Sequence, residues 1–218
     1  MRNQYAVIGL GRFGASVSQE LIHLGHEVLG IDKSLDAVER MKDVLTHTEV
    51  VDCTDESMLK MLGIRNFDCV IIAIGGDIQA STLAAISMKE LGVKRIIAKA
   101  LTELHGRVLH KVGVDRVIFP EKDMGIRLAH QLVAPNLLDY IELSDEYKVS
   151  ELIVPRKLSG YSIQELDPRS EYGCCVVAMD KNRSIIISPK MTDVMNENDK
   201  LIMIGKKQDI EHFELDVF

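Results

Sequence analysis

A glycine-rich turn near the start of the chain most constrains what this sequence can fold into. The motif GLGRFG spans residues 9–14, directly after a short apolar run, and a helical pattern follows it. A GxGxxG sequence between a strand and a helix is typical of a nucleotide-binding βαβ unit. Gly9 suits the tight turn, Gly11 lets the backbone approach a phosphate, and Gly14 lets the helix pack closely on the strand. Backbone N–H groups and the helix dipole would then hold the anion.

The first 120 residues alternate between strand-like and helix-like segments. Short apolar runs predict strands at residues 5–8, 27–31, 47–51, 69–74, 95–98 and 117–119. Helical patterns lie between them at residues 13–24, 34–44, 56–62, 78–91 and 103–112. This alternation indicates an α/β fold, a Rossmann-like, doubly wound parallel sheet.

The pattern changes after Pro120. Residues 122–133 and 137–143 are predicted as helices, forming either a crossover pair that bridges to a second copy or a last Rossmann helix with a linker. Short strands follow at residues 149–154, 174–179, 185–188 and 201–204, with a short helix at 162–166 and a hairpin turn at 180–183. We therefore expect a nucleotide-binding domain at 1–120, crossover or hinge helices at 121–144, and a small α+β domain at 145–218.

Composition excludes several classes of protein. Of the 218 residues, 46% are hydrophobic and 27% charged, which is a globular composition. The net charge of −7 argues against nucleic acid as a partner, because proteins that bind nucleic acid use many basic side chains to neutralise phosphates. We find no apolar run of membrane-spanning length and no signal peptide. The four cysteines lack metal-type CxxC spacing, so we expect them reduced in the cytoplasm.

Residues at the ends of the predicted strands complete a candidate ligand site. Asp32 lies about 20 residues after Gly11, where a carboxylate binds ribose hydroxyls and repels a 2′-phosphate. NAD or an adenosine nucleotide is therefore favoured over NADP. The remaining candidates are Lys33, which follows Asp32; Asp52, Cys53 and Thr54, after the third strand; and Ala73, Ile74, Gly75 and Gly76, at the end of the fourth. The last two groups either line the cleft or form ordinary tight turns.

Charged residues suggest further contacts. Arg12, inside the glycine motif beside Phe13, either contacts a phosphate directly or is a solvated surface arginine. Glu121, after the last predicted strand, either ligates Mg²⁺ or Ca²⁺ or simply begins the next helix. The sequence contains no GxSxG, HExxH or Walker motif, and the short remainder of the chain is small for a substrate domain. These absences favour a nucleotide sensor over an enzyme.

Five segments together resemble the cytosolic RCK subunits of Ktr/Trk-type potassium uptake systems. They are AVIGLGRFG, GIRNFDCVIIAIG, IQASTLAA, KDMG after Pro120-Glu121, and LDYIELSDEY. The resemblance covers essentially the whole chain and implies RCK N- and C-terminal domains. It also implies dimers that assemble into a ring, typically an octamer, on the cytoplasmic face of an integral-membrane potassium-conducting subunit. Binding of ATP, ADP or NAD(H) would change the ring shape and so the ion flux.

The same resemblance implies roles for individual residues. Those implied at the phosphates are Gly9, Gly11, Arg12, Gly14 and Lys99, while Asp32 lies at the ribose and Asp52, Cys53 and Thr54 near the adenine. Glu121 matches a glutamate that helps bind a divalent cation at the nucleotide-bound dimer interface. Residues 163–177, with Asp167-Pro168-Arg169, match a region that binds cyclic di-AMP between two subunits. Cys175 stands where an asparagine is often found in members that bind it, and this argues against that ligand.

Two other functions stay open on the sequence. One is an NAD-dependent oxidoreductase, which would turn over NADH with a substrate. The other is a free-standing nucleotide or redox sensor that uses Cys53 in the cleft and has no membrane partner.

Overall fold

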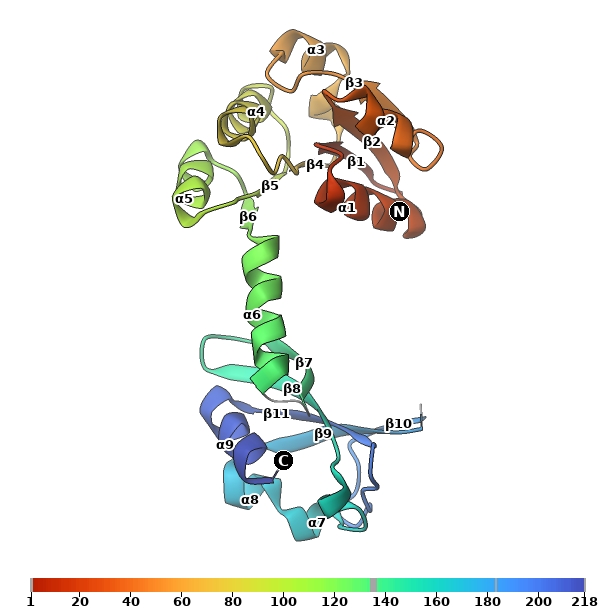
Figure 1. Cartoon of the computed structure of the whole chain (residues 1–218), viewed down its shortest axis with the longest axis vertical. Helices are drawn as coiled ribbons and strands as arrows, with labels where there is room; N and C mark the ends of the chain where they lie inside the picture. Colours follow the sequence, from red (N-terminus) through yellow and green to blue (C-terminus); the bar gives the residue numbers. More distant parts are fainter. Residues whose placement is uncertain (1, 134–136, 183, 218) are drawn as a thin grey trace. The chain divides into compact units, whose positions relative to one another are not determined.

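The computed structural model describes residues 2–133, 137–182 and 184–217, and the chain forms two compact units, Met1–Asp123 and Met124–Phe218. The first unit contains a six-stranded parallel sheet in the order β3-β2-β1-β4-β5-β6 (Figure 1). Its strands are β1 (Gln4–Ile8), β2 (Glu27–Asp32), β3 (His47–Val50), β4 (Cys69–Ile72), β5 (Ile96–Lys99) and β6 (Arg116–Ile118). The strand order reverses between β1 and β4, and such a switch point is where open α/β sheets bind ligands.

Helices cover both faces of this sheet, as the alternating sequence pattern predicts. They are α1 (Arg12–His23), α2 (Leu35–Met41), α3 (Glu56–Met61), α4 (Ile78–Glu90) and α5 (Glu103–Val112), with a 3-10 turn, η1, at Ile64–Asn66. One core packs α3, α4 and α5 on the sheet around Ile8, Ile31 and Ile72. The other core packs α1 and α2 around Val7, Val28 and Ile71. The central strands β1 and β4 are therefore buried on both faces, which explains their nearly continuous apolar sequences.

The second unit is built on a five-stranded antiparallel sheet in the order β10-β9-β11-β8-β7. Its strands are β7 (Leu137–Glu142), β8 (Tyr147–Ile153), β9 (Cys175–Lys181), β10 (Ser184–Ile187) and β11 (Lys200–Lys206). Its short elements are η2 (Arg156–Leu158), α7 (Ile163–Leu166) and α8 (Pro168–Tyr172), and a longer helix, α9 (Lys207–Val217), follows β11. The core of this unit lies between the sheet and α9, where Leu152, Met203 and Phe213 are buried.

The segment after Pro120 differs in part from the sequence prediction. The first predicted helix exists as α6 (Pro120–Val133), but residues 137–143 do not continue as a helix. Residues Leu137–Glu142 form β7 instead, paired antiparallel with β8. The prediction was wrong because a short apolar run is compatible with a helix or a strand, and here pairing with β8 decides between them. Residues 134–136, between the two elements, lie outside the described residues.

Two helices of the second unit were missing from the sequence prediction. Helix α8 begins at Pro168 after Asp167, whose backbone is left-handed, and α9 follows β11 directly. The predicted hairpin is confirmed, since β9 and β10 pair antiparallel on either side of Asn182, while Arg183 lies outside the described residues.

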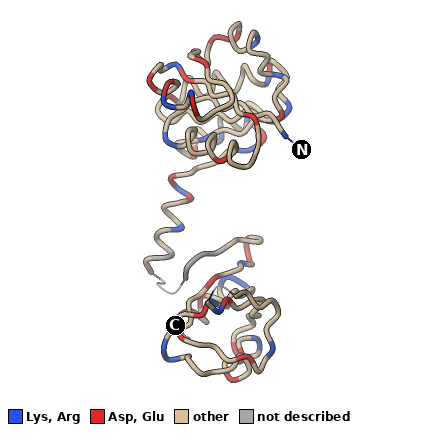
Figure 2. The backbone as a smooth tube through the Cα atoms, turned by 90° about the vertical axis from the view of Figure 1, so that its right-hand side faces the viewer, with Lys and Arg blue, Asp and Glu red and all other residues tan. Residues whose placement is uncertain are grey.

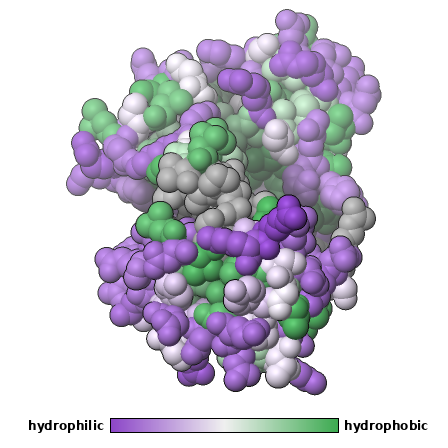
Figure 3. Space-filling model, turned by 60° about the horizontal axis from the view of Figure 1, so that its bottom comes forward, coloured by the Kyte–Doolittle hydropathy of each residue, from purple (hydrophilic) through white to green (hydrophobic). Residues whose placement is uncertain are grey.

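Charge and apolar character are distributed over both units. Figure 2 shows basic and acidic residues interspersed along the backbone, and Figure 3 shows small groups of apolar side chains among hydrophilic ones on the visible face. Within the described residues, none of the helices combines the length and apolar character that crossing a membrane requires.

Helix α9 should be essential to the second unit. Phe213 is fully buried and packs edge-to-face on Tyr172 with ring centroids 5.1 Å apart, so Phe213→Ala should cost about 3–5 kcal/mol of unfolding free energy. Leu215 of the same helix is 83% exposed, and Leu215→Ala should change stability by less than about 0.5 kcal/mol. Guanidinium unfolding of the full chain measures both variants. Equal effects would contradict this account of the core.

Candidate functional site

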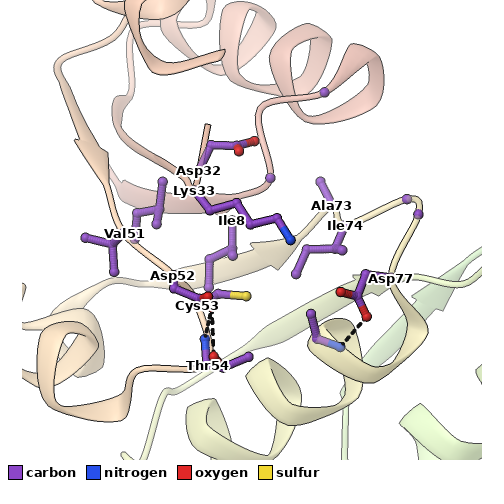
Figure 4. A pocket seen from close by; sticks show the side chains of 16 residues that line it. Ile8, Asp32, Lys33, Val51, Asp52, Cys53, Thr54, Ala73, Ile74 and Asp77 are labelled. Carbon is purple, nitrogen blue, oxygen red and sulfur yellow. Dashed lines mark hydrogen bonds between the residues drawn. The ribbon is translucent and has the colours of Figure 1, made fainter. Parts of the chain in front are cut away.

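A cavity of about 540 Å³ opens at the carboxyl ends of β1–β4, at the switch point of the first unit (Figure 4). Most of the predicted site residues line it: Gly9, Gly11, Asp32, Lys33, Asp52, Cys53, Thr54, Ala73, Ile74 and Gly75. They come from four separate strand ends that the parallel sheet brings to one edge. Arg12, Phe13, Gly14 and Lys99 do not line this cavity.

The glycine-rich turn has the geometry that its sequence predicts. Gly9 has a φ of +97°, a left-handed value that glycine adopts without strain. A β-carbon on Gly14 would lie 1.8 Å from the carbonyl oxygen of Gly9, so only glycine lets α1 start this close to β1. A β-carbon on Gly11 would meet nothing within 4 Å. Gly11 therefore borders open space, and the small residue there leaves the backbone accessible to a ligand.

The start of α1 differs from the starts of the four helices that follow it. Side-chain oxygens cap α2, α3, α4 and α5, from Ser34, Asp55, Asp77 and Thr102 respectively. Helix α1 begins after Gly11, which supplies no side-chain cap. The first amides of a helix lack partners inside the helix, and together with the dipole they attract an anion. Gly11, the residue before this helix, lines the cavity, so the start of α1 lies at the cavity rim.

The carboxylate of Asp32 is held in a fixed orientation at the end of β2. Its Oδ2 accepts a hydrogen bond from the backbone N–H of Leu10 at 2.7 Å, and its Oδ1 accepts one from Ser34 at 2.9 Å. Each carboxylate oxygen can accept more than one hydrogen bond, so Asp32 can still receive ribose hydroxyls. The same side chain thus ties the glycine-rich turn to β2 and presents acceptors to the cavity.

The far end of the cavity, after β3, is acidic and contains a thiol. Asp52 accepts hydrogen bonds from the backbone N–H and the hydroxyl of Thr54, at 2.9 and 2.8 Å, and these hold its pKa below the ordinary value. Burial, with the nearby Asp52 charge, raises the pKa of Cys53 to about 11. Lys33 extends across the cavity toward Ile74 in Figure 4 and offsets part of this negative charge.

A second group of predicted residues lies just beyond the cavity rim. Lys99, at the end of β5, is buried, and its Nζ lies 2.5 Å from Oε1 of Glu121 and 5.7 Å from the centroid of the Phe13 ring. The hydrogen bond from Lys99 is the main reason that the pKa of Glu121 is lowered, and the Arg12 charge contributes. The structure therefore brings Arg12, Phe13, Lys99 and Glu121 into one cluster.

The sequence analysis missed several residues of the cavity wall. These are Ile8, Ile31, Val51, Asp77 and Ala80. The three apolar residues at or next to the ends of β1, β2 and β3 could have been found, because the neighbouring residues at these three strand ends were already predicted to border the cleft. Asp77 could not be assigned, because it is also the N-cap of α4, where its Oδ1 accepts a hydrogen bond from Ala80.

Glu121 alone does not make a complete cation site. Mg²⁺ and Ca²⁺ take about six to eight oxygen ligands, of which one carboxylate supplies at most two. The described residues include no cluster of three or more His, Cys, Asp or Glu side chains able to hold a metal. The Glu121 side chain is 68% exposed, so it can contribute to a cation whose other ligands come from elsewhere.

The region matched to cyclic di-AMP binding comprises α7, α8 and the start of β9. Ile163 is buried, and the carboxylate of Asp167 accepts a hydrogen bond from the N–H of Ser170, so it caps α8. Cys175 is half-buried at the first position of β9.

Comparison with known sequences gives near full-length matches. Residues 5–120 match the TrkA-N domain and residues 149–215 match the TrkA-C domain. The chain is 47% identical over 211 residues to Ktr system potassium uptake protein A of Bacillus subtilis (strain 168), covering 97% of this chain and 95% of that protein. It is 45% identical over 214 residues to Ktr system potassium uptake protein C of the same organism, covering 98% of this chain and 97% of that protein.

Solved structures show the same fold. The GsuK channel superposes with a TM-score of 0.74 at 18% identity, over 100% of this chain and 40% of that one. The GsuK channel bound to NAD gives a TM-score of 0.68, also at 18% identity, with the same coverage. This chain therefore spans less than half the length of the GsuK chain.

Cys53 should react slowly despite its place in the cavity wall. With its pKa at about 11, only about one side chain in ten thousand is a thiolate at pH 7. Iodoacetamide labelling, followed by peptide mass spectrometry, should be about 100-fold slower than for an ordinary thiol and should rise about tenfold per pH unit up to pH 10. Unfolded protein provides the control. Rapid labelling of native Cys53 at pH 7 would contradict this and support a redox sensor.

Proposed function

The chain belongs to the family of potassium uptake proteins built from a TrkA-N and a TrkA-C domain, and from this premise we propose that it is a nucleotide-sensing regulatory subunit. In this proposal it binds ATP, ADP or NAD(H) in the first unit, catalyses no reaction, and controls potassium flux through a separate membrane subunit. The near full-length relatives named as potassium uptake proteins support this over an oxidoreductase.

The uncapped start of α1 at the switch point is the observation that carries the nucleotide site. Its amide donors, the space beside Gly11 and the fixed Asp32 carboxylate match the phosphate and ribose of one ligand. Asp32 would accept the ribose hydroxyls and repel a 2′-phosphate, which favours NAD(H) over NADP(H). The GsuK channel bound to NAD has the same fold, and this supports a dinucleotide as one candidate.

Regulation requires that two ligands stabilise two conformations differently. ATP and ADP differ by one phosphate. In this proposal Arg12 and a Mg²⁺ or Ca²⁺ ion at Glu121 bind that phosphate, with the remaining cation ligands supplied by phosphate oxygens, water or a second copy of the chain. The cluster of Arg12, Lys99 and Glu121 beside the cavity supports this assignment.

Exposed apolar side chains support assembly of several copies. In the first unit they lie on α4 and α5 and include Leu83, Leu104 and Val108. On α6, Met124, Leu128 and Leu132 recur every four residues and are 60%, 53% and 73% exposed. We infer dimers joined into a ring, an octamer by resemblance, held at the cytoplasmic face of the membrane by the potassium-conducting subunit. Covering apolar side chains is a main driving force for such association.

Calorimetric titration of the ligand-free protein tests the nucleotide site. ATP, ADP, NADH, NADPH and cyclic di-AMP are titrated with and without Mg²⁺ or Ca²⁺. We expect ATP binding that the cation strengthens, weaker NADPH than NADH binding, and no binding of cyclic di-AMP. Asp32→Ser should reduce the preference for NADH over NADPH.

Steady turnover of NADH with a substrate would instead indicate an oxidoreductase. The regulatory role would be contradicted if nucleotide did not change the potassium flux through a membrane subunit that is reconstituted together with this protein.

Arg12 should distinguish the triphosphate from the diphosphate. Arg12→Ala removes a guanidinium that can form a charge-assisted contact with the last phosphate, so ATP affinity should fall about tenfold and ADP affinity less. Arg65, which lies in η1 and does not line the cavity, offers a matched control in Arg65→Ala. Equal losses of ATP and ADP affinity on Arg12→Ala would contradict the proposed role.

A further inference from the structure

The Lys99–Glu121 ion pair joins a buried cation to an exposed anion. The Lys99 side chain is 7% exposed and the Glu121 side chain 68% exposed. In the described part of the chain, Glu121 is the one carboxylate within ion-pair distance of Lys99. A buried ammonium without an anionic partner is strongly disfavoured. Lys99 therefore needs an anion beside it, and in the ligand-free protein Glu121 provides it.

The ammonium of Lys99 is also within reach of the proposed phosphate position. A β-carbon on Gly75, which lines the cavity, would lie 3.5 Å from Nζ of Lys99. The same Nζ lies 5.7 Å from the centroid of the Phe13 ring, in the first turn of α1. The ammonium is thus close both to the cavity rim and to the helix start whose amides attract an anion. A polyphosphate chain on α1 that extended past Gly75 would meet it.

Glu121 belongs to the first turn of α6, the helix along which the chain passes from the first unit to the second. Lys122 of the same turn pairs with Glu103 on the surface, where both side chains are more than half exposed. Of these two ion pairs at the first turn of α6, the Lys99–Glu121 pair is therefore the one that lies beside the cavity.

We infer that Glu121 and the ligand's polyphosphate compete for the single ammonium of Lys99, so that nucleotide binding releases the first turn of α6. This inference rests on the proposed function and names how the site acts on the rest of the chain. Without ligand, Lys99 holds Glu121. With ligand, the phosphate takes over Lys99, and Glu121 is freed to move or to receive a cation. Because the two anions exclude each other, whatever favours the released turn also strengthens nucleotide binding.

A double-mutant cycle tests this competition. Glu121→Gln, Lys99→Met and the double variant are titrated calorimetrically with ATP in EDTA. Removing the competing carboxylate should strengthen ATP binding about fivefold, the order expected for freeing one charge-assisted contact. In the Lys99→Met background the same Glu121→Gln change should alter affinity less than about twofold. AMP, which lacks the extended phosphate chain, should respond less than ATP to Glu121→Gln.

Control variants separate competition from other effects. Glu103→Gln removes a carboxylate that contacts the same turn but not Lys99, so it should leave ATP affinity within about twofold. With excess Mg²⁺, the gain from Glu121→Gln should vanish or reverse, because the freed Glu121 then receives the cation.

Three results would overturn the inference. They are an unchanged or weaker ATP affinity of Glu121→Gln in EDTA, an equal gain in the Lys99→Met background, and a gain from Glu103→Gln as large as that from Glu121→Gln. In each case the wild type still binds ATP, so the proposed function stands. Failure of the wild type to bind any nucleotide would overturn both.

Discussion

The close approach of α1 to β1 is the constraint on which the candidate site depends. The carbonyl oxygen of Gly9 lies where a β-carbon on residue 14 would otherwise be, so the helix starts directly at the strand end. Asp32, at the end of the neighbouring strand β2, secures this arrangement by accepting a hydrogen bond from the N–H of Leu10. The start of α1, which has no side-chain cap, is thereby brought to the edge of the sheet where the strand order reverses. Every other contact to a bound nucleotide would be placed relative to this corner.

Charge around the cavity is polarised. Its wall contains three carboxylates, of Asp32, Asp52 and Asp77, against the single ammonium of Lys33. The cluster outside the wall, next to α1, instead brings two cations, Arg12 and Lys99, to one carboxylate. A ligand with hydroxyl and amino donors at one end and phosphates at the other complements this gradient. In the proposed function, this gradient would orient a nucleotide with its phosphates toward α1 and α6.

Much of the first unit was predictable because its signals are local. The six strands and the glycine-rich turn each depend on neighbours in the sequence, and the structure confirms both as structural features. The second unit was harder to predict. Residues 137–142 form a strand only because β8 is available to pair with them. A short apolar run does not by itself indicate whether a distant segment will pair with it.

The sequence by itself determined the Rossmann-like unit, the glycine-rich turn and the acid that ends β2. These features depend on backbone conformation and apolar periodicity, which residues close together in the sequence specify. The tertiary structure alone decided that Lys99 is buried and that Glu121 is its partner. These two residues are 22 positions apart; Lys99 ends β5, and Glu121 comes after β6. Burial, and the need of a buried ammonium for an anion, exist only once the sheet brings those strand ends together.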